Sequence, residues 1–328
     1  MEKENNEEGF VLVARKPCFG LPTACPSSLP VYIYLRFANV PFDLRFNLLH
    51  PDSDQIPYVE SGAYVAYNNE KCGVIESLKE DGIVDLDSGV PSQTIPEWLS
   101  TKAMITSWLG EAVLYELWVG SDGSAADKIY FSDLPWPIGT ILHFKQTLGA
   151  KQVLGITKLN AERREDEIYR RATMAYEALS TMLGEQKFFV ENKSTSLDAV
   201  FLGHTLFTLH ALPDTSVLRS KLLKHSNLVR YSENLKMEFL EVGSSSSSVS
   251  QPPFEPSSSS TPRRTPSSWR SNPKPKPKKE KTEEEKTFRR RAKYFLATQL
   301  VAVVIFLSIL GGSDEVDVED DNDLDYDA

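Results

Sequence analysis

The sequence predicts an α/β domain followed by an all-helical domain, with a single transmembrane helix near the C-terminus. Three observations support this prediction. Strand and helix patterns alternate over residues 10–88, apolar residues recur at helical spacing over 94–241, and residues 294–312 are apolar without a charge. The chain has 328 residues, enough for two modest domains. Its three cysteines are too few for a disulfide framework, so we expect a reducing, cytosol-facing location.

The first domain is predicted from short apolar runs separated by turns. The expected elements are, in order, a strand at 10–14, a helix at 29–38, a strand at 43–47, strands at 56–60 and 63–67, and a helix at 70–79. Ser61 and Gly62, between the last two strands, are typical of a tight hairpin. The order β-α-β and then β-β-α is that of a thioredoxin-like domain, in which Pro57 takes the cis proline position before the hairpin.

The second domain is predicted from helical periodicity and from helix-start signals. Thr94 to Glu97 and Thr195 to Asp198 both match a capping box, in which two side chains satisfy backbone N–H groups at the start of a helix. We expect a helix to begin at each of these places, the second ending before Pro213. A further helix is expected over 162–183, and a last helical region reaches residue 241. A small α/β domain followed by an all-helical one is the order of a glutathione-transferase-like fold.

Residues 294–312 are predicted to form the transmembrane helix. As a helix they would span about 28 Å, close to the thickness of a hydrocarbon core. The alternative, a buried helix of a soluble domain, fails because no core surrounds the segment. A short, moderately apolar span suits the mitochondrial outer membrane, while the span alone leaves the peroxisome and the endoplasmic reticulum open. Basic residues before the span and acidic ones in the tail 313–328 place the N-terminal bulk in the cytosol. The orienting residues are Arg289, Arg290, Arg291 and Lys293.

Two further segments are predicted to be disordered. Residues 1–9 are acidic and have no apolar core, so they cannot act as a secretory signal. Residues 243–287 form a linker of serine runs, prolines and lysines that buries too little apolar surface to fold. The basic half of this linker has two open interpretations: it rests on anionic lipid headgroups, or it only sets topology and solubility. No nucleic-acid-binding module accompanies the basic run, so no nucleic acid is expected as a partner.

Five short segments carry a resemblance to a known family. They are CFGLP at 18–22, IPYV at 56–59, KFF at 187–189, STSLDA at 194–199 and HSNLVRY at 225–231. Together they resemble the metaxins, outer-mitochondrial-membrane relatives of glutathione transferases, over about residues 10–240. The segment at 225–231 is fairly specific, whereas the capping box is shared with most glutathione transferases. The long Ser/Pro/Lys-rich linker and the acidic tail resemble the plant form.

The resemblance implies a function. Metaxins are subunits of the sorting and assembly machinery that inserts β-barrel proteins into the mitochondrial outer membrane. We therefore expect a non-catalytic docking or receptor subunit on the cytosolic face, with its C-terminal tail in the intermembrane space. The implied partners are a barrel-forming insertase core and the other subunits of the machinery, with import-channel receptors and β-barrel precursors as further partners. The implied topology agrees with the orientation predicted from the flanking charges.

Three positions are candidates for a vestigial glutathione site. Cys25 precedes the first helix, whose N-terminus lowers the pKa of a nearby thiol, although a small residue in a loop is the alternative interpretation. Pro57 is the expected cis proline. Glu70 stands where the resemblance to transferases implies an acidic residue for the γ-glutamyl group, but Lys71 replaces the serine expected beside it, which weakens glutathione binding. Cys72 falls inside the expected helix at 70–79 and is expected to pack rather than react.

No catalytic residue, metal or cofactor is assigned, because the five histidines show neither a Ser/His/Asp order nor metal-ligand spacing. Trp136, within the sequence LPWP, is expected in an exposed loop and is a candidate contact. Two alternatives to a docking subunit stay open. One is a membrane-tethered glutathione transferase or thiol oxidoreductase, favoured by the fold and by Cys25. The other is an organelle-tethering adaptor that acts through its linker.

Overall fold

The computed structural model describes residues 9–47, 53–190 and 193–241, together with the single residue Gln299. The linker predicted at 243–287, the acidic tail at 313–328 and, apart from Gln299, the transmembrane helix predicted at 294–312 lie outside the described residues, as do residues 1–8. Within the described part, no helix combines the length and the apolar character needed to cross a membrane.

A four-stranded sheet forms the first part of the chain, with strand order β2-β1-β3-β4. The strands are β1 (Phe10–Ala14), β2 (Phe42–Phe46), β3 (Tyr58–Ser61) and β4 (Tyr64–Tyr67). The central strand β1 pairs in parallel with β2, Leu12 opposite Leu44, and antiparallel with β3, Leu12 opposite Val59. A parallel pair needs a crossover, and helix α1 (Ser28–Phe37) provides it. The predicted β-α-β and β-β-α order is therefore present, and the peptide bond before Pro57 is cis, as expected.

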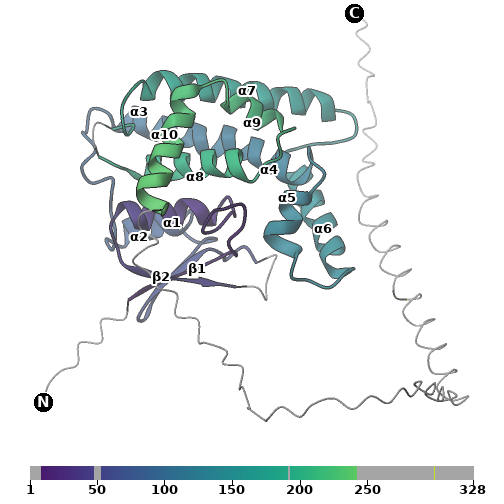
Figure 1. Ribbon diagram of the computed structural model, residues 1–328, viewed down its shortest axis with the longest axis horizontal. Helices are drawn as coiled ribbons and strands as arrows, with labels where there is room; N and C mark the ends of the chain where they lie inside the picture. Colours follow the sequence, from purple (N-terminus) through teal and green to yellow (C-terminus); the bar gives the residue numbers. More distant parts are fainter. Residues whose placement is uncertain (1–8, 48–52, 191–192, 242–298, 300–328) are drawn as a thin grey trace, which may run out of the picture. The chain divides into compact units, whose positions relative to one another are not determined.

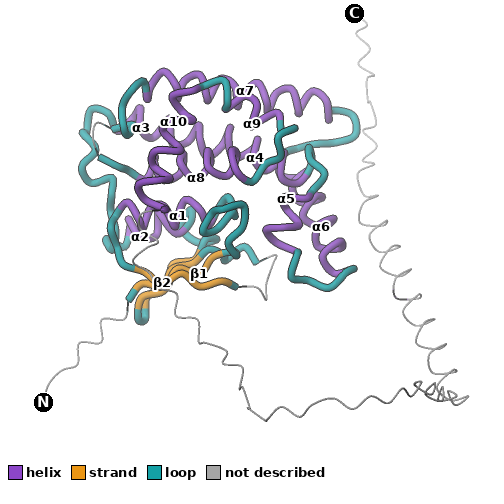
Figure 2. Tube along the Cα trace, in the orientation of Figure 1, coloured by secondary structure: helices purple, strands orange, loops and turns teal. Residues whose placement is uncertain are grey.

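The helix after the hairpin, α2 (Val74–Glu80), begins later than the predicted residue 70. Lys71 and Cys72 have φ angles of 44° and 65°, and Gly73 has a φ of 107°, so the chain cannot be helical there. The expectation that Cys72 packs inside this helix is wrong, because Cys72 lies outside the helix and is exposed. Figure 2 shows α1 and α2 between the sheet and the remaining helices.

All further regular structure in the described chain is helical (Figure 1). A nearly continuous helical run consists of α3 (Ile95–Met104), the π-helical turn η1 (Ile105–Leu109) and α4 (Gly110–Trp118). The remaining elements are α5 (Ser124–Ala126), the π-helical turn η2 (Asp127–Phe131), α6 (Ile138–Val153), α7 (Ala161–Leu183), α8 (Ser196–His210), α9 (Val217–Leu222), α10 (Ser226–Lys236) and the π-helical turn η3 (Met237–Glu241). Almost every side chain of α8 is buried, which explains why its sequence is apolar on all sides.

Of the two predicted capping boxes, one forms. At the start of α8, the Asp198 carboxylate accepts hydrogen bonds from the Thr195 backbone N–H at 3.0 Å and from the Thr195 hydroxyl at 2.8 Å. At the start of α3 the box is absent, because the Thr94 hydroxyl donates to the Pro91 carbonyl at 3.0 Å and Thr94 itself has helical backbone angles. The same local pattern therefore caps a helix in one place and closes a turn in the other.

The two parts of the fold share one hydrophobic core. Helix α1 packs against α8 at Gly203, where an added Cβ would lie 2.7 Å from Cγ of Pro30 and 3.0 Å from its backbone nitrogen. Asp87, in the segment after α2, accepts hydrogen bonds at 2.7 Å from the backbone N–H and from the hydroxyl of Ser196, the first residue of α8. A carboxylate at a helix N-terminus is also favoured by the helix dipole.

We predict that Gly203→Ala destabilises the protein by about 1–3 kcal/mol, because the rigid Pro30 ring cannot make room for the new methyl group. Gly149→Ala is the matched control: Gly149 also lies in a helix, α6, but its added Cβ meets nothing within 4 Å. That variant should be neutral or more stable by up to about 1 kcal/mol, since alanine favours a helix over glycine. Urea denaturation of both variants measures the difference, and equal midpoints would contradict the close α1–α8 contact.

Candidate functional site

Cys25 lies just before α1, where a transferase-like fold would carry its reactive side chain. Its side chain is almost fully buried, with 2% exposed. The sulfur lies 3.1 Å from the hydroxyl of Ser27 and 3.2 Å from the phenol oxygen of Tyr130. Tyr130 belongs to η2, so a residue of the helical part lies directly over the thiol of the sheet part.

The Cys25 thiol has a lowered pKa, but neighbouring side chains shield it from solvent. Burial acts to raise the pKa of Cys25, yet hydrogen bonds from Ser27, Tyr130 and Ser28 outweigh burial and lower it. Burial, together with the neighbouring Cys25, raises the pKa of Tyr130 well above its usual value, so its phenol stays protonated and can donate to the sulfur. A low thiol pKa favours a nucleophile, but a nucleophile must also be reached by its substrate.

Contacts around Tyr130 complete the closure. The Arg15 guanidinium lies over its ring at 5.6 Å from the centroid, and the Trp118 ring packs against it at 5.4 Å. Nearby, Lys16 bridges to Asp133 at 2.5 Å. The cavity bordered by Arg15, Lys16 and Tyr130 measures about 10 Å³, about the size that a single water molecule needs.

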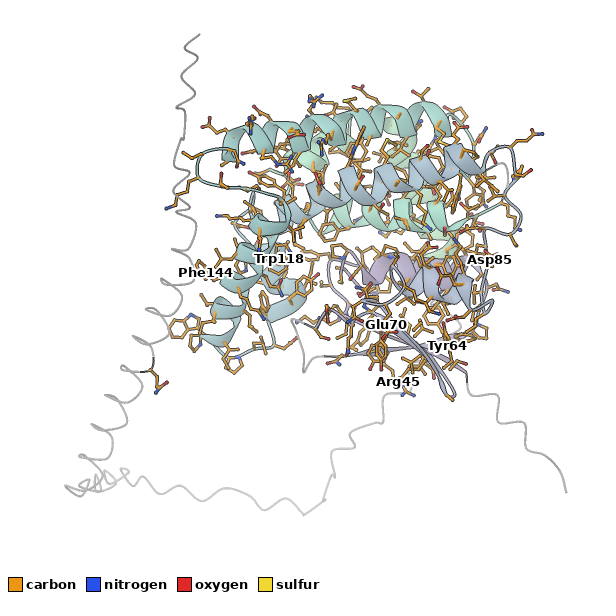
Figure 3. All side chains as sticks on the ribbon, turned by 180° about the vertical axis from the view of Figure 1, so that it is seen from behind. Arg45, Tyr64, Glu70, Asp85, Trp118 and Phe144 are labelled. Atoms are coloured by element: carbon orange, nitrogen blue, oxygen red, sulfur yellow. The ribbon has the colours of Figure 1, made fainter. Side chains whose placement is uncertain are left out.

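The other two predicted site residues lie elsewhere on the first part of the fold. Pro57 is buried and precedes β3, whereas Glu70 is exposed in the turn after β4. Figure 3 shows Glu70 near Tyr64 of β4, with Trp118 and Phe144 in the lobe built by α4, α5 and α6. Lys71, which replaces the serine expected for glutathione binding, forms an ion pair with Asp81 at 2.5 Å. Gly73 precedes helix α2 and provides no side-chain cap, so the start of this helix differs from the acidic-Ser opening expected of a transferase.

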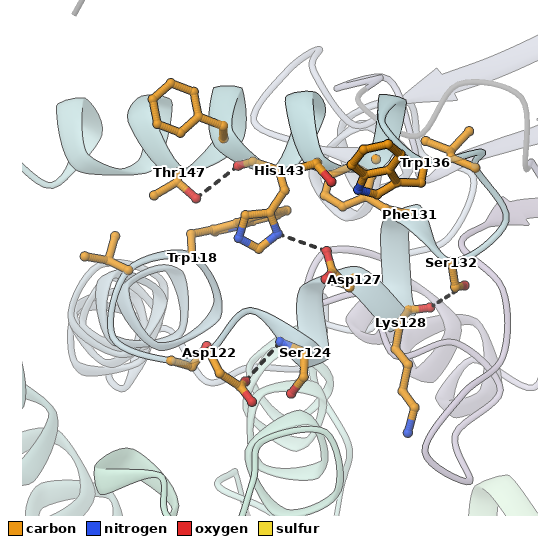
Figure 4. Close-up of a pocket in the computed structure, with 16 residues that line it drawn as sticks. Trp118, Asp122, Ser124, Asp127, Lys128, Phe131, Ser132, Trp136, His143 and Thr147 are labelled. Carbon is orange, nitrogen blue, oxygen red and sulfur yellow. Dashed lines mark hydrogen bonds and ion pairs between the residues drawn. The ribbon is translucent and has the colours of Figure 1, made fainter.

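A larger pocket, of about 850 Å³, lies in the lobe of α4, η2 and α6 (Figure 4). His143 occupies its centre, with Nδ1 at 3.0 Å from an Asp127 carboxylate oxygen and its ring 5.6 Å from that of Trp118. Gly123 is required opposite this ring, because its φ is 76° and an added Cβ would lie 2.4 Å from His143 Cε1. Trp136 borders the pocket and is 82% exposed, which agrees with the prediction of an exposed LPWP loop.

Sequence reasoning missed this pocket for a physical reason. Its walls come from the end of α4, from η2 and from α6, and none of the three was predicted as a separate element. The aromatic residues that line it follow no motif. The one available signal was the LPWP sequence, which marks Trp136 as exposed but does not reveal the cavity next to it.

The buried histidine His204 has a structural role. Burial lowers the pKa of His204 to about 3, so its imidazole is neutral and pairs with the Tyr176 hydroxyl at 2.7 Å. Among the residues that the structure describes, no group of three or more His, Cys, Asp or Glu side chains is arranged to hold a metal ion.

Comparison with known proteins decides the family. The family model for the glutathione S-transferase N-terminal domain matches residues 26–123, and that for the glutathione S-transferase C-terminal domain matches residues 172–235. A protein of Arabidopsis thaliana named "Mitochondrial outer membrane import complex protein METAXIN" is 59% identical over 325 residues, which cover 98% of this chain and 100% of that protein. The chain belongs to the metaxin family.

Other metaxins are more distant. Metaxin-1 of Mus musculus is 25% identical over 305 residues, covering 90% of this chain and 87% of that protein. Metaxin-2 of Homo sapiens is 24% identical over 220 residues, covering 66% of this chain and 82% of that protein. Among solved structures, glutathione transferase GSTFuA2 from Phanerochaete chrysosporium superposes with a TM-score of 0.48 at 10% identity, over 70% of this chain and 98% of that one. The predicted order of a thioredoxin-like domain and a helical transferase-like domain is confirmed for this metaxin by the two matching family models and by its own topology.

We predict that thiol reagents distinguish the three cysteines by exposure rather than by pKa. Exposed Cys72 should react first, half-buried Cys18 more slowly, and buried Cys25 at least about a hundredfold more slowly, because labelling it requires a local opening of about 3 kcal/mol. Mass spectrometry of partly labelled protein measures the order.

Two substitutions of Tyr130 provide the control for this prediction. Tyr130→Ala removes the ring that covers the thiol and should expose Cys25, whereas Tyr130→Phe keeps the ring and should leave Cys25 protected. Rapid labelling of Cys25 in the unmodified chain would contradict the closed site.

Proposed function

We propose that this chain is a membrane-anchored, non-catalytic subunit of the mitochondrial outer-membrane machinery for import and assembly of β-barrel proteins. The observation that carries the proposal is its 59% identity, over nearly its whole length, to a protein named as part of the mitochondrial outer membrane import complex. The match covers 98% of this chain, so it extends beyond the transferase-like part into the linker and the apolar C-terminal segment.

The membrane anchor is residues 294–312. The uncharged length of this segment matches a hydrocarbon core, and the basic cluster Arg289, Arg290, Arg291 and Lys293 precedes it. The transferase-like part then faces the cytosol, and the acidic tail at 313–328 faces the intermembrane space. In this arrangement the linker at 243–287 lets the folded part reach partners over a distance on the order of 40 Å.

The folded part acts by docking. The thiol of Cys25, at the position of a transferase's reactive side chain, lies under Tyr130 and is almost fully buried. The partners are a barrel-forming insertase core and the other subunits of the machinery, with import-channel receptors and β-barrel precursors as further candidates.

Deletion of residues 294–328 tests the anchor. We expect the shortened protein to leave the membrane fraction almost completely, because no other single attachment approaches the stability of an inserted helix. Barrel proteins should then accumulate less. Deletion of 313–328 alone is the matched control and should keep the protein in the membrane. Normal barrel-protein levels with only the soluble fragment present would show that anchorage is not central to the function.

One observation favours a second function, a membrane-tethered glutathione transferase or thiol oxidoreductase: hydrogen bonds lower the pKa of Cys25. The docking proposal predicts no turnover of glutathione with an electrophilic substrate above the uncatalysed rate. It also predicts that Cys25→Ala changes nothing in this assay, with Cys72→Ala as the matched control. Turnover that Cys25→Ala abolishes and Cys72→Ala preserves would establish the second function instead.

A further inference from the structure

The segment from Leu134 to Asn160 has an unusual charge. It contains Lys145, Lys151 and Lys158 but neither an aspartate nor a glutamate, in a chain whose formal net charge is −10. Asp133 and Glu162 lie just outside it on either side. Helix α6 occupies most of this segment, and Figure 1 shows it at the outer edge of the helical part, beyond α5.

The side of α6 that faces away from the protein carries three exposed apolar side chains. Ile141, Phe144 and Leu148 are 40%, 45% and 38% exposed, and their i, i+3, i+7 spacing places them on one face. The opposite side packs inward, where Ala150 is buried and a Cβ on Gly139 would touch the Phe131 side chain at 3.3 Å. A soluble helix normally turns its apolar side toward the core, so an apolar outer side indicates a surface that is covered in the assembled protein.

Further apolar side chains are exposed near the two ends of α6. Trp136, between two prolines, is 82% exposed just before the helix, and Val153, on another side of the helix, is 78% exposed at its end. Leu159, in the following loop, is fully exposed. In sequence, Lys145 and Lys151 lie four residues after Ile141 and three after Leu148, so their positions border the apolar face. We call this surface, formed by Trp136, Ile141, Phe144, Leu148 and the bordering lysines, the α6 face.

The composition of the α6 face favours one occupant. Protein interfaces are depleted in lysine and enriched in arginine, yet all basic residues from 134 to 160 apart from His143 are lysines. Lysines beside an apolar stripe, with an exposed tryptophan, are typical of a helix that lies in the headgroup region of a bilayer. There the apolar side chains enter the acyl boundary, the lysine stems extend along it, and the ammonium groups meet anionic headgroups.

We propose that the α6 face binds the surface of a membrane that contains anionic lipids. This proposal rests on the membrane location in the proposed function, but it concerns a different part of the chain from the anchor. Binding through α6 would hold the folded part against the bilayer. The linker alone would let it move freely.

The test uses the full chain reconstituted into vesicles whose acyl chains carry bromine, a short-range quencher of tryptophan fluorescence. The vesicles consist of phosphatidylcholine with or without phosphatidylinositol. The signal of Trp136 is the difference between the unmodified chain and Trp136→Phe. We expect this signal to be quenched in the anionic vesicles and much less in phosphatidylcholine alone.

Lys151→Glu should lower the equilibrium constant for contact between the α6 face and the anionic vesicle surface at least about fivefold. This is the equivalent of about 1 kcal/mol for one basic residue near an anionic surface. Adding Leu148→Asp should abolish it. The matched control is Leu223→Asp with Lys224→Glu, the same substitutions at an exposed leucine and lysine just after α9, which should leave quenching unchanged. Circular dichroism and urea denaturation check that each variant folds.

The outcomes separate this proposal from the proposed function. A chain that is anchored in the vesicles but shows no quenching of Trp136 overturns the α6 proposal and leaves the import function standing. A chain that never associates with membranes contradicts the proposed function itself. Loss of a co-purifying subunit from Leu148→Asp, without any quenching in the unmodified chain, would show that the α6 face is a protein interface.

Discussion

The N-terminus of α8 holds this structure together, because two carboxylates from different parts of the chain meet there. Asp198 closes the capping box and also accepts hydrogen bonds from the Phe189 backbone N–H at 3.0 Å and the Tyr231 hydroxyl at 3.1 Å. Burial raises its pKa to about 6, and these hydrogen bonds limit the rise. Asp87 reaches the same helix end from the segment after α2 and also pairs with Lys79 at 2.7 Å. One helix end thus fixes the first part of the fold, α10 and the loop before α8 to the core helix.

The contacts at the N-terminus of α8 also affect the thiol site at Cys25. With α1 held against α8 through the close contact at Gly203, the start of α1 is fixed relative to the helical part, and η2 can place Tyr130 directly on Cys25. The scaffold of a glutathione transferase is therefore retained in this metaxin, while the thiol before α1 is buried under a tyrosine of the helical part. Functional variety on an old scaffold arises in the sites built on its surface rather than in the fold itself. In this chain the most distinctive surface is the outer side of α6.

Much of the fold could be predicted from local patterns, and the exceptions have physical causes. The strand at 10–14 and the helix near 162–183 have strong periodicity, and they appear within one residue of their predicted bounds. Thr94 and Thr195 begin the same pattern, but only Thr195 caps, because the Pro91 carbonyl takes the Thr94 hydroxyl. The late start of α2 follows from three consecutive positive φ angles, which no periodicity reveals. For the candidate site, Cys25 was found from its position, but its closure depends on Tyr130, 105 residues away in the sequence.

The claim that this fold docks in an import machinery is tested most directly by purifying the tagged chain from mitochondria in mild detergent and identifying what accompanies it by mass spectrometry. A docking subunit should recover a barrel-forming insertase together with import-channel subunits, and Cys25→Ala should recover the same set. Recovery of metabolic enzymes or organelle-tethering proteins in their place would rule out docking in the import machinery and make glutathione binding the next property to measure.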